Sequence, residues 1–146
     1  MNKIIKRVLF VIVAFCLLFI IFASALRERY VGFYVKGHID ELNAYIAVIS
    51  DEANEKNDWR DLQDGWRMYT SEYKNGWEVA LFVHEGGSQC VSFNAFSIGI
   101  APSGSEEGVF YVSDDNAFNM RTDYANFPIT HMREIEEHWF FFREEY

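Results

Sequence analysis

Hydrophobic and polar positions change their spacing several times along the chain, and the first pattern is the most pronounced. From Val8 to Leu26 the sequence holds 19 residues in which Ser24 is the one polar side chain. A helix needs about 20 apolar residues to cross a hydrocarbon core of about 30 Å, and about 17 at the least. This run therefore predicts a transmembrane helix, and residues 1–28 are assigned to an N-terminal membrane anchor.

A signal sequence that is removed is the alternative to a retained anchor. Secretory signals usually have a shorter apolar run of about 7–15 residues. However, Ala23-Ser24-Ala25 has the small-residue pattern that signal peptidase recognises, and cleavage after Ala25 would release a soluble secreted domain. Three cations precede the run, and positive charge tends to stay in the cytoplasm. We therefore expect a protein of the inner (cytoplasmic) membrane with its N-terminus on the cytoplasmic side and its C-terminal domain outside the cytoplasm.

Residues 29–37 form a predicted juxtamembrane connector, and residues 38–146 a predicted extracytoplasmic domain. Gly32 and Gly37 leave open whether a helix continues through the connector. Beyond it, apolar residues recur at steps of three and four, which is the spacing of an amphipathic helix. They are Ile39, Leu42, Ile46, Ile49 and Ala53. Trp59 to Gln63 is expected to add a short helical turn.

The spacing then changes to two, which is typical of strands. Trp66 to Tyr73 and Trp77 to His84 flank Lys74-Asn75-Gly76, a strong signal for a β-hairpin. A two-residue turn would mix polar and apolar side chains on both faces. A three-residue loop with Gly76 left-handed gives one apolar face and leaves Glu72 beside Glu78 on the other. We favour the second register because it builds a core.

The remaining pattern predicts further strands and an irregular segment. A slip in the alternation at Ala95-Phe96 indicates a bulge. The segment 129–135 fits either a helix or a strand. The other expected elements are a strand at Cys90–Ile100, a loop at Pro102–Gly108, a short strand at Val109–Ser113, an irregular stretch at Asp114–Phe127 and a closing strand at Trp139–Phe142. The sum is an α+β fold, with one amphipathic helix packed on an antiparallel sheet of about 4–5 strands.

The net charge of the domain narrows the classes of partner that it can bind. All 22 acidic residues lie after Leu26, together with ten of the 13 Lys and Arg residues, so this part of the chain carries a net charge of −12. Nucleic acid is a poor partner for such a domain, because phosphate binding needs clustered cations. A basic protein partner is favoured, since the charge would steer its approach.

Cys90 and His84 are the candidates for thiol chemistry, because they bracket a predicted five-residue turn. A cysteine beside a histidine is the minimum for nucleophilic thiol catalysis. Such sites also need an orienting group and an oxyanion donor, and no motif supplies them. The competing interpretation is a buried, inert thiol. Outside the cytoplasm, Cys90 is also open to pairing between chains, because no second cysteine follows the anchor.

His131, Glu134 and His138 are the candidates for a metal site. Their spacing of three and four would place all three on one face of a helix. In a strand, Glu134 and His138 would share a face that excludes His131. The spacing does not match the H-E-x-x-H pattern of zinc proteases, and the acidic clusters lack the spacing of a calcium loop. No cofactor is predicted.

These observations favour a small single-pass membrane protein whose acidic extracytoplasmic domain is a non-enzymatic protein-binding module. It would be held in the membrane by Val8 to Leu26 and would bind a protein, with a basic partner favoured by the charge. A periplasmic inhibitor or immunity-type protein with a basic partner is the sharper alternative. The secreted soluble domain is a second alternative, and a thiol- or metal-dependent enzyme ranks below both.

Overall fold

The computed structural model describes residues 3–100, 103–123 and 128–145, and it divides the chain into two compact units, Met1–Tyr30 and Val31–Tyr146. Helix α1 (Lys3–Lys56) contributes to both. In the first unit its apolar side chains are exposed, with Phe10 at 75% and Phe15 at 71%. Its most apolar window has a mean hydropathy of 3.1 and is 0% buried. This long apolar helix is consistent with a membrane anchor or a signal sequence.

In the second unit, α1 continues through Gly32 and Gly37 and is kinked at His38, where φ is −133° and ψ is 21°. The glycines therefore do not end the helix. After the kink, the helical spacing predicted from Ile39 to Ala53 is confirmed, because Leu42, Ile49 and Ala53 are fully buried. Packing of one apolar face against the sheet supports this part of the helix.

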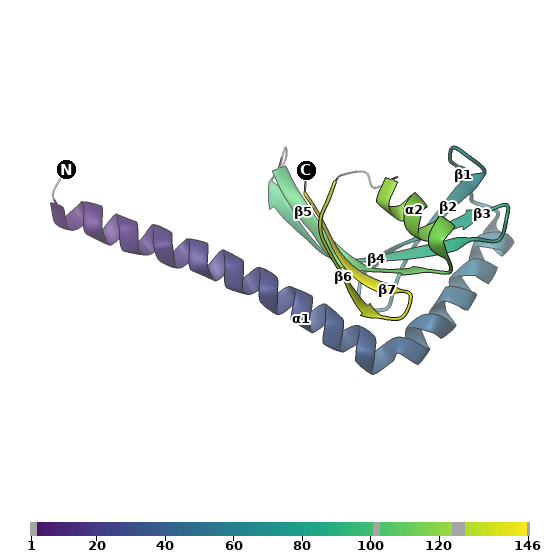
Figure 1. Ribbon diagram of the computed structural model, residues 1–146, viewed down its shortest axis with the longest axis horizontal. Helices are drawn as coiled ribbons and strands as arrows, with labels where there is room; N and C mark the ends of the chain where they lie inside the picture. The colour runs from purple at the N-terminus through teal and green to yellow at the C-terminus, as the bar shows by residue number, and fades with distance from the viewer. Residues whose placement is uncertain (1–2, 101–102, 124–127, 146) are drawn as a thin grey trace. The chain divides into compact units, whose positions relative to one another are not determined.

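The second unit is built on an antiparallel sheet of seven strands in the order β1-β2-β3-β4-β5-β7-β6 (Figure 1). The α+β class is confirmed, but the predicted number of 4–5 strands was too low. The strands are β1 (Arg60–Asp61), β2 (Trp66–Glu72), β3 (Glu78–His84), β4 (Gln89–Ile100), β5 (Ser103–Val112), β6 (Ile129–Glu136) and β7 (Trp139–Glu145).

Each face of the sheet carries its own core, with α1 and α2 (Asp115–Asp123) on opposite sides (Figure 1). On the α1 face, side chains such as Leu42 and Ile49 pack with Leu81 and Phe93. On the α2 face, a smaller cluster is formed by Trp66, Cys90, Phe110, Val112, Ala117, Met120 and Phe142. Burial of one large apolar side chain contributes about 1.5–3 kcal/mol, so both clusters stabilise the domain.

The preferred hairpin register is confirmed. Glu72 lies opposite Glu78 in the β2–β3 pair, and Tyr69 lies opposite Leu81. Gly76 closes the turn with φ +75°, a left-handed conformation that glycine adopts without a steric penalty. One face of the hairpin is consequently apolar and the other carries the two carboxylates.

The slip predicted at Ala95-Phe96 is also present, as a register shift between Asn94 and Phe96 in the β4–β5 pair. The shift brings the β4 backbone close to β5. A Cβ atom on Gly108 would lie 2.0 Å from the carbonyl oxygen of Phe93. Gly108 is therefore required at this point by close backbone approach.

Four local predictions were wrong or incomplete. A strand begins at Ser103, within the expected loop; Pro102, the first residue of that loop, lies outside the described residues. Helix α2 occupies part of the expected irregular stretch, of which 124–127 lie outside the described residues. The short strand β1 replaces the expected helical turn. The ambiguous segment after Pro128 is strand β6.

Candidate functional site

Cys90, the candidate nucleophile, lies in the core on the α2 face of the sheet. The Cys90 side chain is fully buried under α2, and this burial raises the pKa of its thiol to about 12. Both ring nitrogens of His84 are engaged elsewhere. Nδ1 accepts a hydrogen bond from the Gly86 N–H at 2.9 Å, and Nε2 donates to the Asp64 carbonyl at 3.1 Å. His84 is thus held as a structural group of the β3–β4 turn.

The metal candidates are not gathered on one face. His131 and Glu134 lie on β6, opposite Arg143 and Phe140 of β7, and these alternate positions point to opposite faces. His138 lies in the β6–β7 turn with φ +68°. Across the described residues, no group of three or more His, Cys, Asp or Glu side chains is arranged to hold a metal ion.

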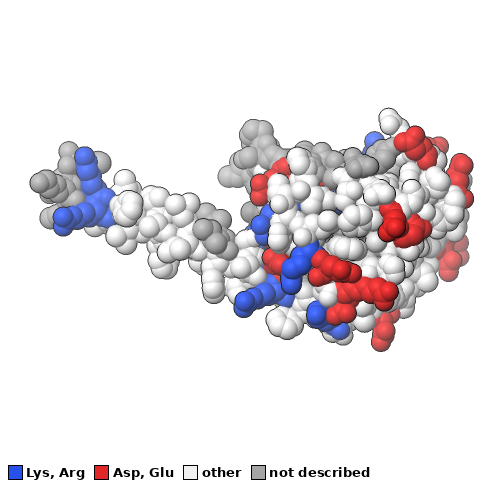
Figure 2. Space-filling model, in the orientation of Figure 1, with Lys and Arg blue, Asp and Glu red and all other residues white. Residues whose placement is uncertain are grey.

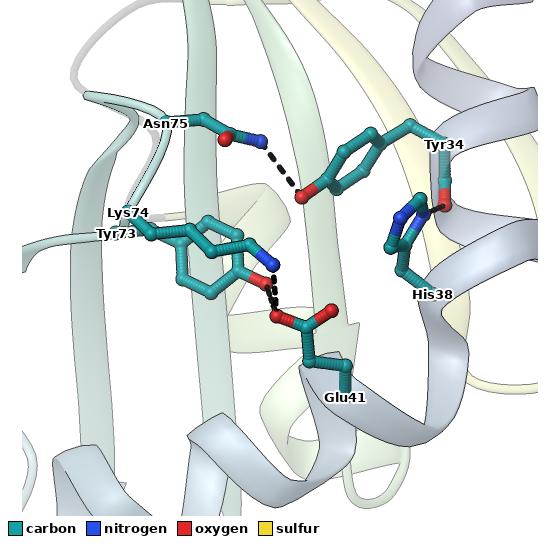
Figure 3. Close-up of polar contacts among 6 residues, drawn as sticks. All are labelled: Tyr34, His38, Glu41, Tyr73, Lys74 and Asn75. Carbon is teal, nitrogen blue, oxygen red and sulfur yellow. Dashed lines mark hydrogen bonds and ion pairs between the residues drawn. The ribbon is translucent and has the colours of Figure 1, made fainter.

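A polar cluster joins the kink of α1 to the β2–β3 turn (Figure 3). The carboxylate of Glu41 accepts a hydrogen bond from the Tyr73 hydroxyl at 2.9 Å and forms an ion pair with Lys74. Across the gap, Asn75 Nδ2 donates to the Tyr34 hydroxyl at 2.7 Å. At the kink, His38 Nδ1 donates to the Tyr34 carbonyl at 2.9 Å.

The hydrogen bonds of this cluster shift the pKa values of its members so that each bond is kept at neutral pH. Hydrogen bonds from Lys74 and Tyr73 lower the pKa of Glu41. Burial, together with the neighbouring Tyr34 and Glu41, raises the pKa of Tyr73. Each group therefore keeps the protonation state that its partner requires, which favours a fixed helix–hairpin contact over proton transfer at neutral pH.

A different set of side chains lies on the α2 face, beyond the edge of its apolar cluster. Four carboxylates cross the sheet there, and we call them the acidic row. They are Glu72 on β2, Glu78 on β3, Glu106 on β5 and Glu144 on β7. Asn94 of β4 lies opposite Glu78 and continues the row between β3 and β5. Figure 2 shows acidic side chains at many places over the visible surface and fewer Lys and Arg side chains.

The row lines two adjoining hollows. One, of about 150 Å³, has the polar lining residues Thr70, Glu78, Ser92, Asn94, Glu106, Arg121 and Glu144 and the apolar lining residues Met68, Ala80, Phe82 and Met120. The other, of about 420 Å³, is lined by residues of the β2–β3 hairpin that include Glu72 and Glu78. Thr70 and Glu78 border both hollows, and we refer to the pair of hollows as the groove.

The inner end of this groove is closed by a buried ion pair. Arg121 Nη2 of α2 lies 2.5 Å from Glu144 Oε1 of β7, and the side chains are 8% and 5% exposed. The guanidinium also lies over the ring of Phe142, at 4.6 Å from its centre. Arg121 Nε, by contrast, has no hydrogen-bond acceptor among the described residues.

Glu106 is a half-buried carboxylate of the row with a raised pKa. Burial is the largest cause, repulsion from Glu144 and then Glu78 adds to it, and the charge of Arg121 opposes it in part. Its hydrogen bond from Asn94 Nδ2 is long, at 3.4 Å. A cation placed in the groove would therefore be stabilised by a carboxylate that the protein itself leaves weakly paired.

Sequence reasoning found only part of this site. The hairpin register placed Glu72 beside Glu78, and Glu106 entered only with Glu107 as an acidic pair without the spacing of a calcium loop. Glu144 and Arg121 were not singled out. Comparisons with protein-family models, curated proteins and solved structures found no match.

Proposed function

We propose that this chain is a single-pass membrane protein whose acidic domain lies outside the cytoplasm and binds another protein there. The observation that carries the proposal is the acidic row, of which Glu72 and Glu78 are exposed, whereas Glu144 is buried against Arg121 of α2. Arg121 is the one cation in the described lining of the inner hollow. A surface of this kind fits a basic partner through charge complementarity.

The apolar part of α1 supports the membrane half of the proposal. Its side chains are exposed on all sides, which is unfavourable in water and favourable in lipid. A tethered domain of this kind presents a binding surface at the membrane without chemistry of its own. An inhibitor or immunity-type protein is the form of this function that the acidic row favours.

Photo-crosslinking in intact cells tests the proposal. A benzoylphenylalanine replaces Thr70, which borders both hollows of the groove, and a control replaces the exposed Glu55 on α1. We expect one protein adduct from position 70 that is absent from position 55. Absence of an adduct at position 70, or the same adducts at both positions, contradicts the proposal.

A further inference from the structure

Residues 27–36 of α1, which we call the collar, differ in charge from the residues that follow them. The collar holds three cations and one acidic residue, a net charge of +2, whereas residues 37–146 hold seven cations and 21 acidic residues, a net charge of −14. The collar begins directly after Leu26, where the apolar run ends. The local excess of positive charge therefore adjoins the segment assigned to the membrane, and lipid phosphates are the anionic groups that it matches there.

An exposed aromatic side chain lies in the middle of the collar. Phe33 is 76% exposed, the largest fraction for any large hydrophobic side chain among the described residues. The other side of the helix is fixed here, because Val31 and Val35 are fully buried in the core of the second unit. Phe33 therefore points away from this core. Such a position is unfavourable in water and favourable at the boundary between lipid head groups and acyl chains.

The length of α1 brings Phe33 within reach of the head groups. The helix has no break before the kink at His38, and Phe33 follows Leu26 by seven residues, a rise of about 10 Å. A helical side chain leans toward the N-terminus, so the ring lies closer to the apolar run than its own Cα does. The head-group layer is about 5–7 Å thick on each side of a bilayer.

Two exposed side chains precede Phe33 in the last turn of the first unit. Tyr30 is 52% exposed, and tyrosine is enriched at the level of the head groups. Arg29 is also exposed, and its guanidinium on a long apolar stem suits a lipid phosphate. The collar thus combines aromatic and cationic side chains, which is the composition of a membrane-surface segment.

We propose that the collar is a lipid-contacting surface, on which Tyr30 and Phe33 enter the head-group layer and Arg29 binds lipid phosphate. This inference rests on the membrane half of the proposed function, because it takes α1 to be retained in a bilayer. Since α1 enters the core at Val31 without a flexible linker, lipid contact at the collar keeps the acidic domain close to the membrane surface.

Fluorescence quenching by lipid tests the inference with the full chain in phosphatidylcholine nanodiscs, of which a fraction of the lipid carries a TEMPO spin label on its head group. An aromatic, apolar amino acid with an acetylnaphthyl fluorophore replaces Phe33. The same label at Lys36 and at Val48 provides two controls, because both are exposed on α1. Lys36 pairs with Glu136 of β6, and Val48 lies beyond the kink. We expect emission to fall about twofold at position 33, clearly less at 36 and not at 48.

Three outcomes of this experiment would overturn the inference. Absence of quenching at position 33 would place Phe33 outside the head-group layer. Equal quenching at positions 33 and 36 would show proximity to the membrane without a side of the helix that faces lipid. Equal quenching at positions 33 and 48 would show that lipid reaches any exposed part of α1.

The role of Arg29 is tested with the label kept at position 33. Arg29→Gln removes the charge, and its matched control is Arg60→Gln, which removes an exposed arginine on β1. We expect R29Q to reduce the quenching and R60Q to leave it unchanged, because only Arg29 lies next to the apolar run. Equal quenching in the two variants contradicts the contact between Arg29 and phosphate.

The collar and the proposed function fail separately. If the chain stays in the nanodiscs and position 33 is not quenched, the anchor stands and the collar is wrong. If position 33 is quenched as expected but position 70 captures no partner in cells, the collar stands and the protein-binding half of the proposed function is wrong. A chain that starts at Leu26 and does not enter nanodiscs would overturn both the retained anchor and the collar.

Discussion

The Glu106 carboxylate disfavours folding at neutral pH, although its charge can serve in binding a basic partner. Its carboxylate is half-buried beside Glu144 and Glu78, and burial together with these charges raises its pKa. The folded state therefore binds the proton more tightly than the unfolded chain. This destabilisation is present above the folded pKa and disappears as the pH falls below the unfolded value.

Glu106→Gln is accordingly expected to stabilise the domain at neutral pH. The gain should be about 0.5 kcal/mol, a small value because solvent screens a group that is only partly buried. It should vanish in acid, where the wild-type carboxyl is already protonated. Urea denaturation of the full chain in nanodiscs, followed by tryptophan fluorescence at several pH values, measures it.

Glu137→Gln, on the exposed β6–β7 turn, should leave the free energy of unfolding unchanged and serves as the control. A loss of stability in E106Q at neutral pH would mean that the carboxylate is compensated in the folded state. A gain in stability combined with the loss of the adduct at position 70 in cells would identify Glu106 as a residue whose charge is kept for binding.

At the scale of elements, polar bonds around Glu41 add to the apolar packing between α1 and the β2–β3 hairpin. Tyr73 is 3% exposed, and its hydroxyl donates to the Glu41 carboxylate at 2.9 Å (Figure 3). Because hydrogen bonds from Lys74 and Tyr73 lower the pKa of Glu41, their stabilisation is present above its usual value near 4.5. It is lost as the pH falls through the lower folded pKa.

Tyr73→Phe should therefore reduce the free energy of unfolding by about 1 kcal/mol at neutral pH, since it removes one hydrogen bond and keeps the ring. The difference from wild type should shrink in acid, where protonated Glu41 is a weaker acceptor. Denaturation curves across the acidic range give both values. Tyr111→Phe is the control, because the Tyr111 hydroxyl makes no hydrogen bond with the described residues; an equal loss there would contradict the assignment.

Elements with a local signal could be predicted from the sequence. The hairpin follows from alternation around Lys74-Asn75-Gly76, and the β4 bulge follows from the slip at Ala95-Phe96. Helix α2 has a weaker signal, in which the Asp114 carboxylate accepts from the Ala117 N–H at 2.9 Å as an N-cap. Helix α2 could not be predicted from apolar periodicity, because it has few apolar residues; Ala117 and Met120 pack against the sheet.

The acidic row could be predicted only within the hairpin. Glu72 and Glu78 share a face as soon as the turn is fixed. The position of Glu106 depends on the β4 bulge and on a strand that starts with the polar segment Ser103–Gly108, which has little strand propensity of its own. Pairing with β4 and β7 imposes strand structure there, so long-range contacts place Glu106 beside Glu144.

At the scale of the whole molecule, two units of opposite character share one chain. The apolar helix has 19 residues with one polar side chain, and the following residues carry a net charge of −12. If the helix remains in the membrane, it confines the acidic domain to a thin layer at the surface. Confinement raises the effective concentration toward a partner in the same layer, so a weak contact can still be occupied.

The retained helix is therefore the premise that the binding model most needs, and the Ala23-Ser24-Ala25 triplet provides its test. We expect mass spectrometry of the protein purified from membranes to show residues 1–25 still attached, and alkaline carbonate to leave it in the membrane pellet. Replacing Ala23 and Ala25 together by Leu abolishes the small-residue pattern and should change neither result. Cleavage would be established if the wild-type protein starts at Leu26 and is released by carbonate while the variant stays intact in the pellet. The acidic domain would then act as a soluble protein, and its affinity for a partner would have to come from contacts alone.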